Sequence, residues 1–237
     1  SLIVVGGGGA PRAPEQVKSI SETFDNAMPG TGWGMTETNA IGTGTGGQDY
    51  LDRPSSSGRP SAVLDLAIVD EDGNHLPTGE RGELLIKGSS MFREYWNRPD
   101  ANEKAFVDGW FRTGDVAYLD EENFLFIVDR IKDLVIRGGE NVGCGEVEAA
   151  LLVHEDILEA SVYGIPDERL GEEIGTTVHC KNVIDEDELR AFLVNHLAKF
   201  KIPKFIRFSS EPLPRIASGK IAKRVLRDQA HAELGLA

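Results

Sequence analysis

The chain has 237 residues, of which 40% are hydrophobic and 27% are charged, as in a globular protein with one large or two modest domains. Its formal net charge of −14 argues against a nucleic-acid partner, because a phosphate backbone attracts basic surfaces. Two cysteines, Cys144 and Cys180, do not make a disulfide framework and favour a reducing, cytoplasmic compartment, with peripheral membrane contact left open. No apolar run approaches the roughly 20 residues of a membrane span, and the first residues lack the basic region of a signal peptide.

The first residues predict a buried strand, a glycine loop and a helix. Residues 2–5 are apolar, as in a buried parallel strand, and residues 6–9 are four glycines. Such a loop lets the backbone approach a flat or charged ligand closely, although a plain strand-to-helix turn explains it equally well. Pro14 predicts the start of a helix that places Val17 and Phe24 on one face. Because a strand comes first, we expect the chain to begin inside a larger domain.

Residues 32–38, GWGMTET, combine an aromatic ring with glycines, hydroxyl groups and a carboxylate. Trp33 lies between two glycines, so its ring can lie flat against a nucleobase. Thr36 and Glu37 offer oxygen atoms that suit a phosphate and Mg²⁺. The alternative is a glycine-rich surface loop with a packed tryptophan. Residues 41–58 predict a loop, and their GTGTGG lacks the Gly-Lys-Ser/Thr ending of a phosphate-binding loop.

Short strands are predicted from Gly58 to residue 129, and together they suggest a small β-barrel. The last two, VAYLD and FLFIVD, flank a polar turn and predict a hairpin. Just before the hairpin, the Thr-Gly-Asp turn at 113–115 leaves a carboxylate at its edge. Tyr95 and Trp96 precede this turn, and we expect them to pack rather than to take part in chemistry.

Residues 129–133, DRIKD, place charge between two apolar strands, which is typical of a surface joint. A glycine turn, RGGEN at 137–141, follows. Beyond it the pattern α-β-β-α-β-α predicts a compact α+β domain of about a hundred residues. In that domain, Asp185 predicts a helix N-cap with Glu188 three residues later.

These segments resemble the adenylate-forming superfamily, which includes acyl-CoA synthetases, firefly luciferase and the adenylation domains of peptide synthetases. The matching blocks are TGD, DRIKD and GGEN followed by EVE, together with GWGMTET, a GGAP loop at residues 8–11 and PRIASGKI at 214–221. The resemblance implies the end of a large α/β domain, made of a strand-helix piece and a small β-barrel, and then a complete α+β domain. The expected boundaries are 1–48 for the remnant, 49–129 for the barrel and 130–237 for the C-terminal domain.

The resemblance also implies a nucleotide site. It assigns cofactor binding to Gly8, Gly9, Ala10, Trp33, Gly34, Asp115, Arg130, Gly138, Gly139 and Glu140. In this assignment Trp33 stacks on adenine, Asp115 holds the ribose hydroxyls and Arg130 lies by the same ribose and phosphate. The glycine turn at 138–141 delivers the thiol of CoA.

Catalysis is assigned, by the same resemblance, to Lys220, Thr36 and Glu37. Lys220 reaches the reacting carboxylate and the α-phosphate, Thr36 touches the α-phosphate, and Glu37 helps to hold Mg²⁺. A cation suits this step because two anions meet and negative charge grows on the bridging oxygens. A solvated lysine in a Pro/Gly loop is the alternative. Lys132 is the implied hinge about which the C-terminal domain swings.

The chain departs from the family pattern in the loops. Trp33 stands where tyrosine is commoner, and Ile216 stands where threonine is usual. After GEN and a β-branched residue, the family commonly has an aromatic residue or histidine and then proline; this chain has Gly143 and Cys144 there. Cys144 is expected to be a small buried residue rather than a nucleophile.

The expected function is that of an acyl-CoA synthetase, which joins a carboxylic or fatty acid to CoA with ATP and Mg²⁺ through an acyl-adenylate. Nothing in the 237 residues matches the family's Lys-containing phosphate loop, so we expect this chain to be the C-terminal portion and inactive alone. One alternative is an adenylation module that serves a carrier protein. Another is a non-catalytic module that binds a nucleotide or a partner.

Overall fold

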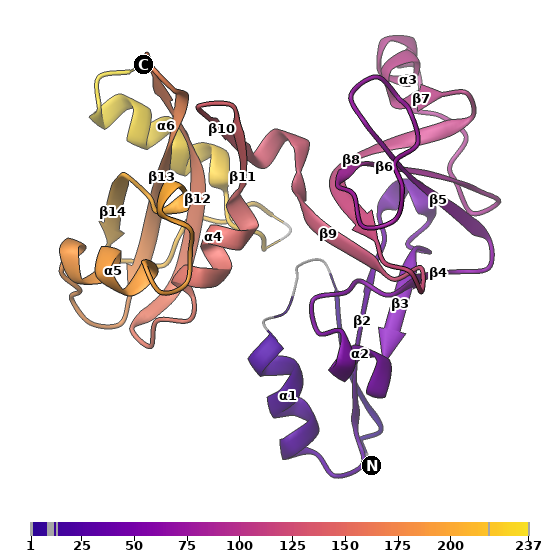
Figure 1. Cartoon of the computed structure of the whole chain (residues 1–237), viewed down its shortest axis with the longest axis horizontal. Coiled ribbons are helices and arrows are strands. Elements are labelled where there is room, and N and C mark those ends of the chain that lie inside the picture. Colours follow the sequence, from indigo (N-terminus) through magenta and orange to yellow (C-terminus); the bar gives the residue numbers. More distant parts are fainter. Residues whose placement is uncertain (1, 9–11, 13, 218, 237) are drawn as a thin grey trace. The chain divides into compact units, whose positions relative to one another are not determined.

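The chain divides into two compact units: residues 1–128, called unit 1 below, and residues 129–237, called unit 2. The computed structural model describes residues 2–8, 12, 14–217 and 219–236, and Figure 1 shows its helices and strands. Within these residues, every helix is too short or too polar to cross a membrane.

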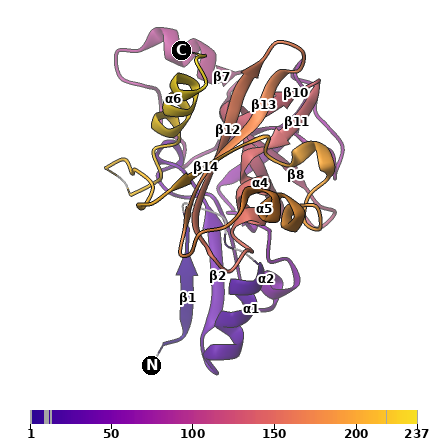
Figure 2. The ribbon, with the colours of Figure 1, turned by 90° about the vertical axis from the view of Figure 1, so that its left-hand side faces the viewer.

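Unit 1 begins with sheet A, in which glycine and threonine are frequent. Its strands, in hydrogen-bonded order, are β1 (Val4–Gly7), β2 (Met28–Trp33), β3 (Thr43–Gly46) and β4 (Arg59–Pro60). The first pair is parallel and the others are antiparallel, so helix α1 (Pro14–Thr23) forms the crossover that a parallel pair needs (Figure 2). The helix starts at the predicted Pro14 and buries Val17. It ends before Phe24, which is 41% exposed, so the expected apolar face is shorter than the pattern indicated.

The structure corrects the expectation of a loop at residues 41–58. This segment contains β3 and helix α2 (Gln48–Asp52), and the 3₁₀ turn η1 (Thr36–Thr38) precedes it. β3 forms because β2 supplies an antiparallel partner, with Trp33 opposite Thr43. Tertiary pairing thus overrides the low strand propensity of glycine.

Sheet B occupies the segment for which a small barrel was predicted. Its strands are β5 (Leu64–Val69), β6 (Gly82–Gly88), β7 (Phe106–Val107), β8 (Trp110–Leu119) and β9 (Leu125–Arg130), and helix α3 (Pro99–Ala105) leads into β7. Strand β8 is central, because β6, β7 and β9 all pair with it. The predicted hairpin is present: the Asp120 carboxylate accepts the backbone N–H groups of Glu122 and Phe124, which closes the turn. Leu84, Ile86 and Leu125 form the centre of the apolar cluster of this sheet.

Sheet C forms unit 2. Its strands are β10 (Leu134–Arg137), β11 (Glu140–Gly143), β12 (Ile157–Asp167), β13 (Gly171–Cys180) and β14 (Phe205–Ser209). Its helices are α4 (Cys144–Leu151), α5 (Glu186–Leu193) and α6 (Lys223–Glu233), with 3₁₀ turns η2 (Ile131–Asp133) and η3 (Lys199–Lys201). From α4 onward, the order of helices and strands is the predicted α-β-β-α-β-α, and the β10–β11 hairpin adds two strands to it.

Alternation along β12 explains how the helices cover this sheet. Ala160 and Val162 point into a cluster with α4 and α5, whereas Tyr163 and Ile165 point into a second cluster with α6. Figure 2 accordingly shows α4 and α5 on one side of the sheet and α6 on the other. Sheet C is therefore covered on both faces.

The predicted N-cap of α5 is confirmed and gives a stability test. The Asp185 carboxylate accepts the backbone N–H groups of Asp187 and Glu188. Asp185→Ala should lower the free energy of unfolding of unit 2 by about 1 kcal/mol, because two helix donors lose their acceptor. Urea unfolding followed by NMR signals from α5 measures this. Asp185→Asn keeps an acceptor and should stay near the wild type; equal losses for both variants would contradict the capping account.

Candidate active site

A buried carboxylate lies at the centre of the candidate site in unit 1. Asp115 of β8 is only 3% exposed, and its Oδ2 accepts a hydrogen bond of 2.9 Å from Nε1 of Trp33, the last residue of β2. The Thr113 hydroxyl donates to the Leu84 carbonyl and accepts the Asp115 N–H, which fixes the predicted turn. Gly114 in that turn has φ +71°, a conformation that favours glycine. Two motifs that are 82 residues apart thus meet at one carboxylate.

The backbone around Trp33 is closely packed. A Cβ added to Gly42 would lie 1.8 Å from the Trp33 carbonyl oxygen, so only glycine fits there. The Trp33 ring itself is half-buried and packs against the apolar cluster of sheet B. The indole is therefore held both by its N–H group and by its ring.

Glu37 is positioned by a residue that the sequence patterns did not single out as functional. The Tyr95 hydroxyl donates to Glu37 Oε1 at 2.8 Å, and the Phe92 N–H donates to the Glu37 carbonyl at 2.7 Å. Burial, together with the adjacent Glu37 carboxylate, raises the pKa of Tyr95 to about 12, so the phenol stays a donor at neutral pH. Thr36 is exposed beside this carboxylate in the turn η1.

The expectation for Tyr95 and Trp96 was half right. Tyr95 packs against the apolar cluster of sheet B, but Trp96 is 84% exposed. Both residues belong to the irregular segment before α3, where neither helical nor strand periodicity indicates which side chain points inward. The Tyr95–Glu37 contact spans 58 residues of sequence and left no local signal.

The glycine loop is only partly described. Gly8 and Gly34 are exposed in unit 1, whereas the predicted cofactor-binding residues Gly9 and Ala10 lie outside the described residues. Gly8 follows β1, and Gly34 follows β2, the strand that pairs with β1.

Unit 2 carries the remaining predicted residues. Arg130 ends β9, and Lys132 lies in η2; both side chains are exposed. Next to them, Asp129 is fixed, because its Oδ2 accepts the Gly145 N–H at 2.9 Å near the start of α4. Burial raises the pKa of Asp129, and hydrogen bonds from the Gly145 and Arg130 amides partly offset this effect. The hinge role of Lys132 stays a prediction.

The glycine turn between β10 and β11 has the geometry of a tight hairpin. Gly138 and Gly139 have φ of +62° and +87°, which suits a two-residue turn with both residues in the left-handed region. Glu140 begins β11 and is exposed, like both glycines. Lys220 is also exposed, on a second turn near the C-terminus.

Cys144 does not have the surroundings of a nucleophile. Its side chain is 1% exposed at the start of α4. Burial raises the pKa of the thiol, and the nearby Lys223 opposes this only in part. The thiol form is therefore kept at neutral pH, in agreement with the expected structural role.

Two models of known protein families match parts of the sequence. The AMP-binding enzyme family matches residues 1–96, and the AMP-binding enzyme C-terminal domain matches residues 146–220. The chain therefore belongs to the AMP-binding, adenylate-forming enzyme family.

Individual relatives agree with this assignment. The long-chain-fatty-acid–CoA ligase FadD13 of Mycobacterium tuberculosis is 38% identical over 226 residues, which are 95% of this chain and 44% of that protein. The o-succinylbenzoate CoA synthetase MenE of Bacillus subtilis, solved with the acyl-adenylate OSB-AMP, has a TM-score of 0.88 at 34% identity. The match covers 95% of this chain and 46% of that one. A second MenE structure, which holds ATP and a magnesium ion, has a TM-score of 0.86 at 34% identity and the same coverage.

The chain thus has the fold of adenylate-forming enzymes and spans less than half the length of these relatives.

The Trp33–Asp115 contact gives a test in unit 1. Trp33→Phe keeps an aromatic ring but removes the N–H donor to a buried carboxylate. The free energy of unfolding of unit 1 should fall by about 1.5–3 kcal/mol, as for a hydrogen bond to a charged group. Trp110→Phe is the matched control, because this half-buried tryptophan contacts His75 and Lys87 through its ring. Chemical unfolding measures both; equal losses would show that the N–H donor adds nothing beyond packing.

Proposed function

We propose that these residues belong to an acyl-CoA synthetase, in which unit 1 binds the adenosine part of ATP and of the acyl-adenylate. The observation that carries this proposal is the Trp33–Asp115 hydrogen bond, which brings two family motifs to one buried carboxylate. The overall reaction converts a carboxylic acid, ATP and CoA into acyl-CoA, AMP and diphosphate. Adenylation in this family uses a Lys-containing phosphate-binding loop, and nothing in the 237 residues matches it. In this proposal, the part of the family fold outside these residues supplies that loop.

Each residue of unit 1 has a chemical reason for its role. The two oxygen atoms of a carboxylate such as Asp115 accept hydrogen bonds, which suits the two ribose hydroxyls. The Trp33 ring can stack on adenine, and the exposed Gly34 leaves room for the nucleotide. Thr36 offers a hydroxyl to the α-phosphate.

Glu37 fits the expected Mg²⁺. The ion prefers oxygen ligands and is commonly held by one or two carboxylates together with substrate phosphates. One Glu37 oxygen accepts the Tyr95 hydroxyl, and that bond fixes the orientation of the carboxylate. Bound there, the ion would neutralise phosphate charge, while Tyr95 keeps Glu37 in place.

Unit 2 supplies different groups to the two half-reactions. In the first, a carboxylate oxygen attacks the α-phosphorus of ATP, a P–O bond forms, and the bond to the leaving diphosphate breaks. Lys220 stabilises the anionic transition state of this step. In the second, the CoA sulfur attacks the acyl carbon, the bond to AMP breaks, and the thiol proton passes to solvent.

The Gly138–Gly139 turn presents backbone without side chains, so the narrow thiol arm can pass close to it. Lys132 is the proposed hinge residue, because exchanging the two loops at one site requires a joint with two backbone geometries. Arg130 is proposed to lie by the ribose and phosphate.

The acyl substrate is proposed to be a fatty acid, since FadD13 is named for that class. MenE, of similar identity, is named for o-succinylbenzoate, so an assay should include aryl and short acids as well. A carrier protein in place of CoA is the second candidate acceptor. Transfer of the acyl group to free CoA in solution would decide between them.

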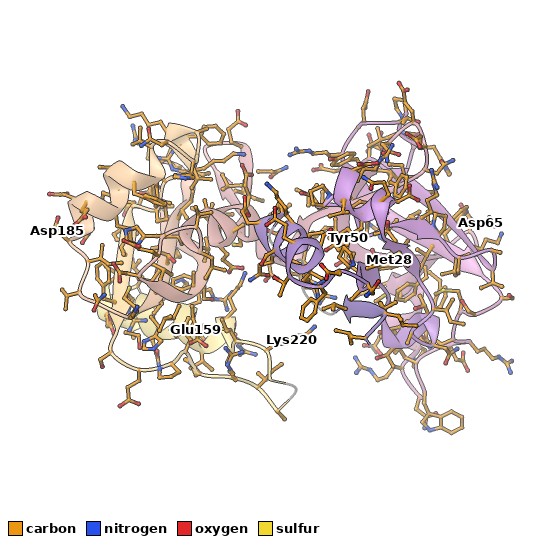
Figure 3. All side chains as sticks on the ribbon, turned by 90° about the horizontal axis from the view of Figure 1, so that it is seen from below. Met28, Tyr50, Asp65, Glu159, Asp185 and Lys220 are labelled. Atoms are coloured by element: carbon orange, nitrogen blue, oxygen red, sulfur yellow. The ribbon has the colours of Figure 1, made fainter. Side chains whose placement is uncertain are left out.

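Nucleotide binding is tested on this chain by calorimetry with a non-hydrolysable acyl-AMP analogue. Asp115→Ala should weaken binding about ten- to a hundredfold, the value of one or two hydrogen bonds to a charged group. Asp65→Ala, which removes an exposed carboxylate on β5 (Figure 3), should bind like the wild type. No binding, or equal binding by all three proteins, would favour a non-catalytic interaction module.

Catalysis is tested in a ligase completed by joining this chain to the preceding half of a relative. Lys220→Ala should slow adenylation, measured by pyrophosphate exchange, by about 10²–10³-fold, as for the loss of one preorganised charge-stabilising group. Thioester formation from supplied acyl-adenylate should change little. Lys181→Ala, at an exposed lysine of the same unit, is the control. If pyrophosphate exchange survives in Lys220→Ala, the proposed role is wrong.

A further inference from the structure

The turn that carries Lys220 is a small closed hairpin. The Ile216 N–H donates to the Lys220 carbonyl and the Gly219 N–H donates to the Ile216 carbonyl, both at 2.9 Å. At its base, the Ala222 N–H donates to the Pro214 carbonyl at 2.7 Å. The backbone of Lys220 is therefore held, although its side chain is exposed.

An arginine–glutamate pair fastens this hairpin to sheet C. The Arg215 guanidinium donates to the Gly219 carbonyl at 2.6 Å and also to Oε1 of Glu159 on β12. Oε2 of Glu159 accepts the N–H of Leu213, a residue that is 2% exposed. One carboxylate thus holds Leu213 and Arg215 on the N-terminal side of the loop, and Arg215 in turn binds Gly219 (Figure 3 labels Glu159 and Lys220).

The charge on Glu159 is favoured by these partners. Partial desolvation alone would raise its pKa, but the hydrogen bonds from the Leu213 amide and Arg215 together outweigh this and lower the pKa. Glu159 is therefore ionised at neutral pH.

A second pair of the same kind fastens the Gly138–Gly139 turn. Arg137 donates two hydrogen bonds, of 2.7 and 3.0 Å, to the two carboxylate oxygens of Glu173 on β13. The Glu173 side chain is only 4% exposed. The Gly138 N–H also donates to the Leu170 carbonyl at 2.8 Å, so this turn is anchored at Arg137 and at the amide of its first glycine.

We propose that Arg215–Glu159 and Arg137–Glu173 are two separate positioning pairs, the first for Lys220 and the second for the thiol-side turn. The proposal rests on the proposed function of the two loops. A lysine has a flexible four-carbon stem, so its ammonium group can be aimed only if its backbone is fixed. Misplacement by about 1 Å can cost a hundredfold in rate. Because each pair holds one loop, each should control one half-reaction.

The test measures both half-reactions in a completed ligase that contains this chain. Glu159→Gln should slow pyrophosphate exchange by about ten- to a hundredfold, and should leave thioester formation from supplied acyl-adenylate within about twofold. Glu173→Gln should slow thioester formation by about the same factor and leave pyrophosphate exchange within about twofold. Glu233→Gln is the matched control, because Glu233 pairs with Arg207 through two hydrogen bonds between α6 and β14, apart from both loops. It should change neither rate.

The proposal would be overturned if Glu159→Gln or Glu173→Gln slowed both half-reactions equally. It would also be overturned if neither variant slowed any half-reaction. If Glu173→Gln does not fold, Arg137→Lys replaces it, since the Arg137 side chain is the more exposed partner at 26%.

Amide hydrogen exchange on the chain itself separates this inference from the proposed function. Glu159→Gln should accelerate exchange at Ile216 and Gly219 and leave Gly138 unchanged, and Glu173→Gln should do the opposite. Unchanged exchange at these amides would refute the pairs as anchors. A wild-type ligase without pyrophosphate exchange would instead refute the proposed function, whatever the exchange data show.

Discussion

The hydrogen bond between Trp33 and Asp115 is the contact on which the account of unit 1 depends. A carboxylate that is 3% exposed needs donors, because burying an unsatisfied charge costs several kcal/mol. The indole N–H of Trp33 supplies one of these donors and so joins the end of β2 in sheet A to β8 in sheet B. A backbone bridge between Gly58, which directly precedes β4, and Leu125 of β9 adds a second connection. The candidate site therefore lies where two sheets meet, and each sheet contributes one motif.

Unit 2 follows a different plan, in which one sheet carries the two turns to which the proposed function assigns Lys220 and the thiol arm. The long antiparallel pair β12–β13 runs through its centre; β12 contributes the half-buried Glu159 and β13 the buried Glu173. Each glutamate binds an arginine at the base of a different turn. Local backbone bonds close both turns, so the loops keep their shapes without depending on each other. Such an arrangement suits a unit that presents alternative loops to one substrate.

Local patterns predicted much of this fold, because they depend on neighbouring residues. Pro14 and Asp185 gave the starts of two helices, and the alternating residues around Asp120 gave the hairpin β8–β9. The sequence motifs also indicated Trp33 and Asp115. They did not indicate which distant side chains meet. Tyr95 and Glu37 are 58 residues apart, Arg215 and Glu159 are 56 apart, and only the topology of the sheets brings such pairs together. The strand β3 was missed for the same reason, since its partner β2 stabilises it.

The central claim is that Trp33 and Asp115 form the nucleotide site, and the indole N–H signals of the three tryptophans test it most directly. The ¹⁵N-labelled chain is titrated with AMP, and Trp96 and Trp110 serve as internal references in the same spectrum. The account predicts that the Trp33 signal shifts with added AMP, that the other two stay in place, and that Asp115→Ala requires about ten- to a hundredfold more AMP for the same shift. A Trp33 signal that stays fixed while the Trp96 or Trp110 signal moves would contradict it.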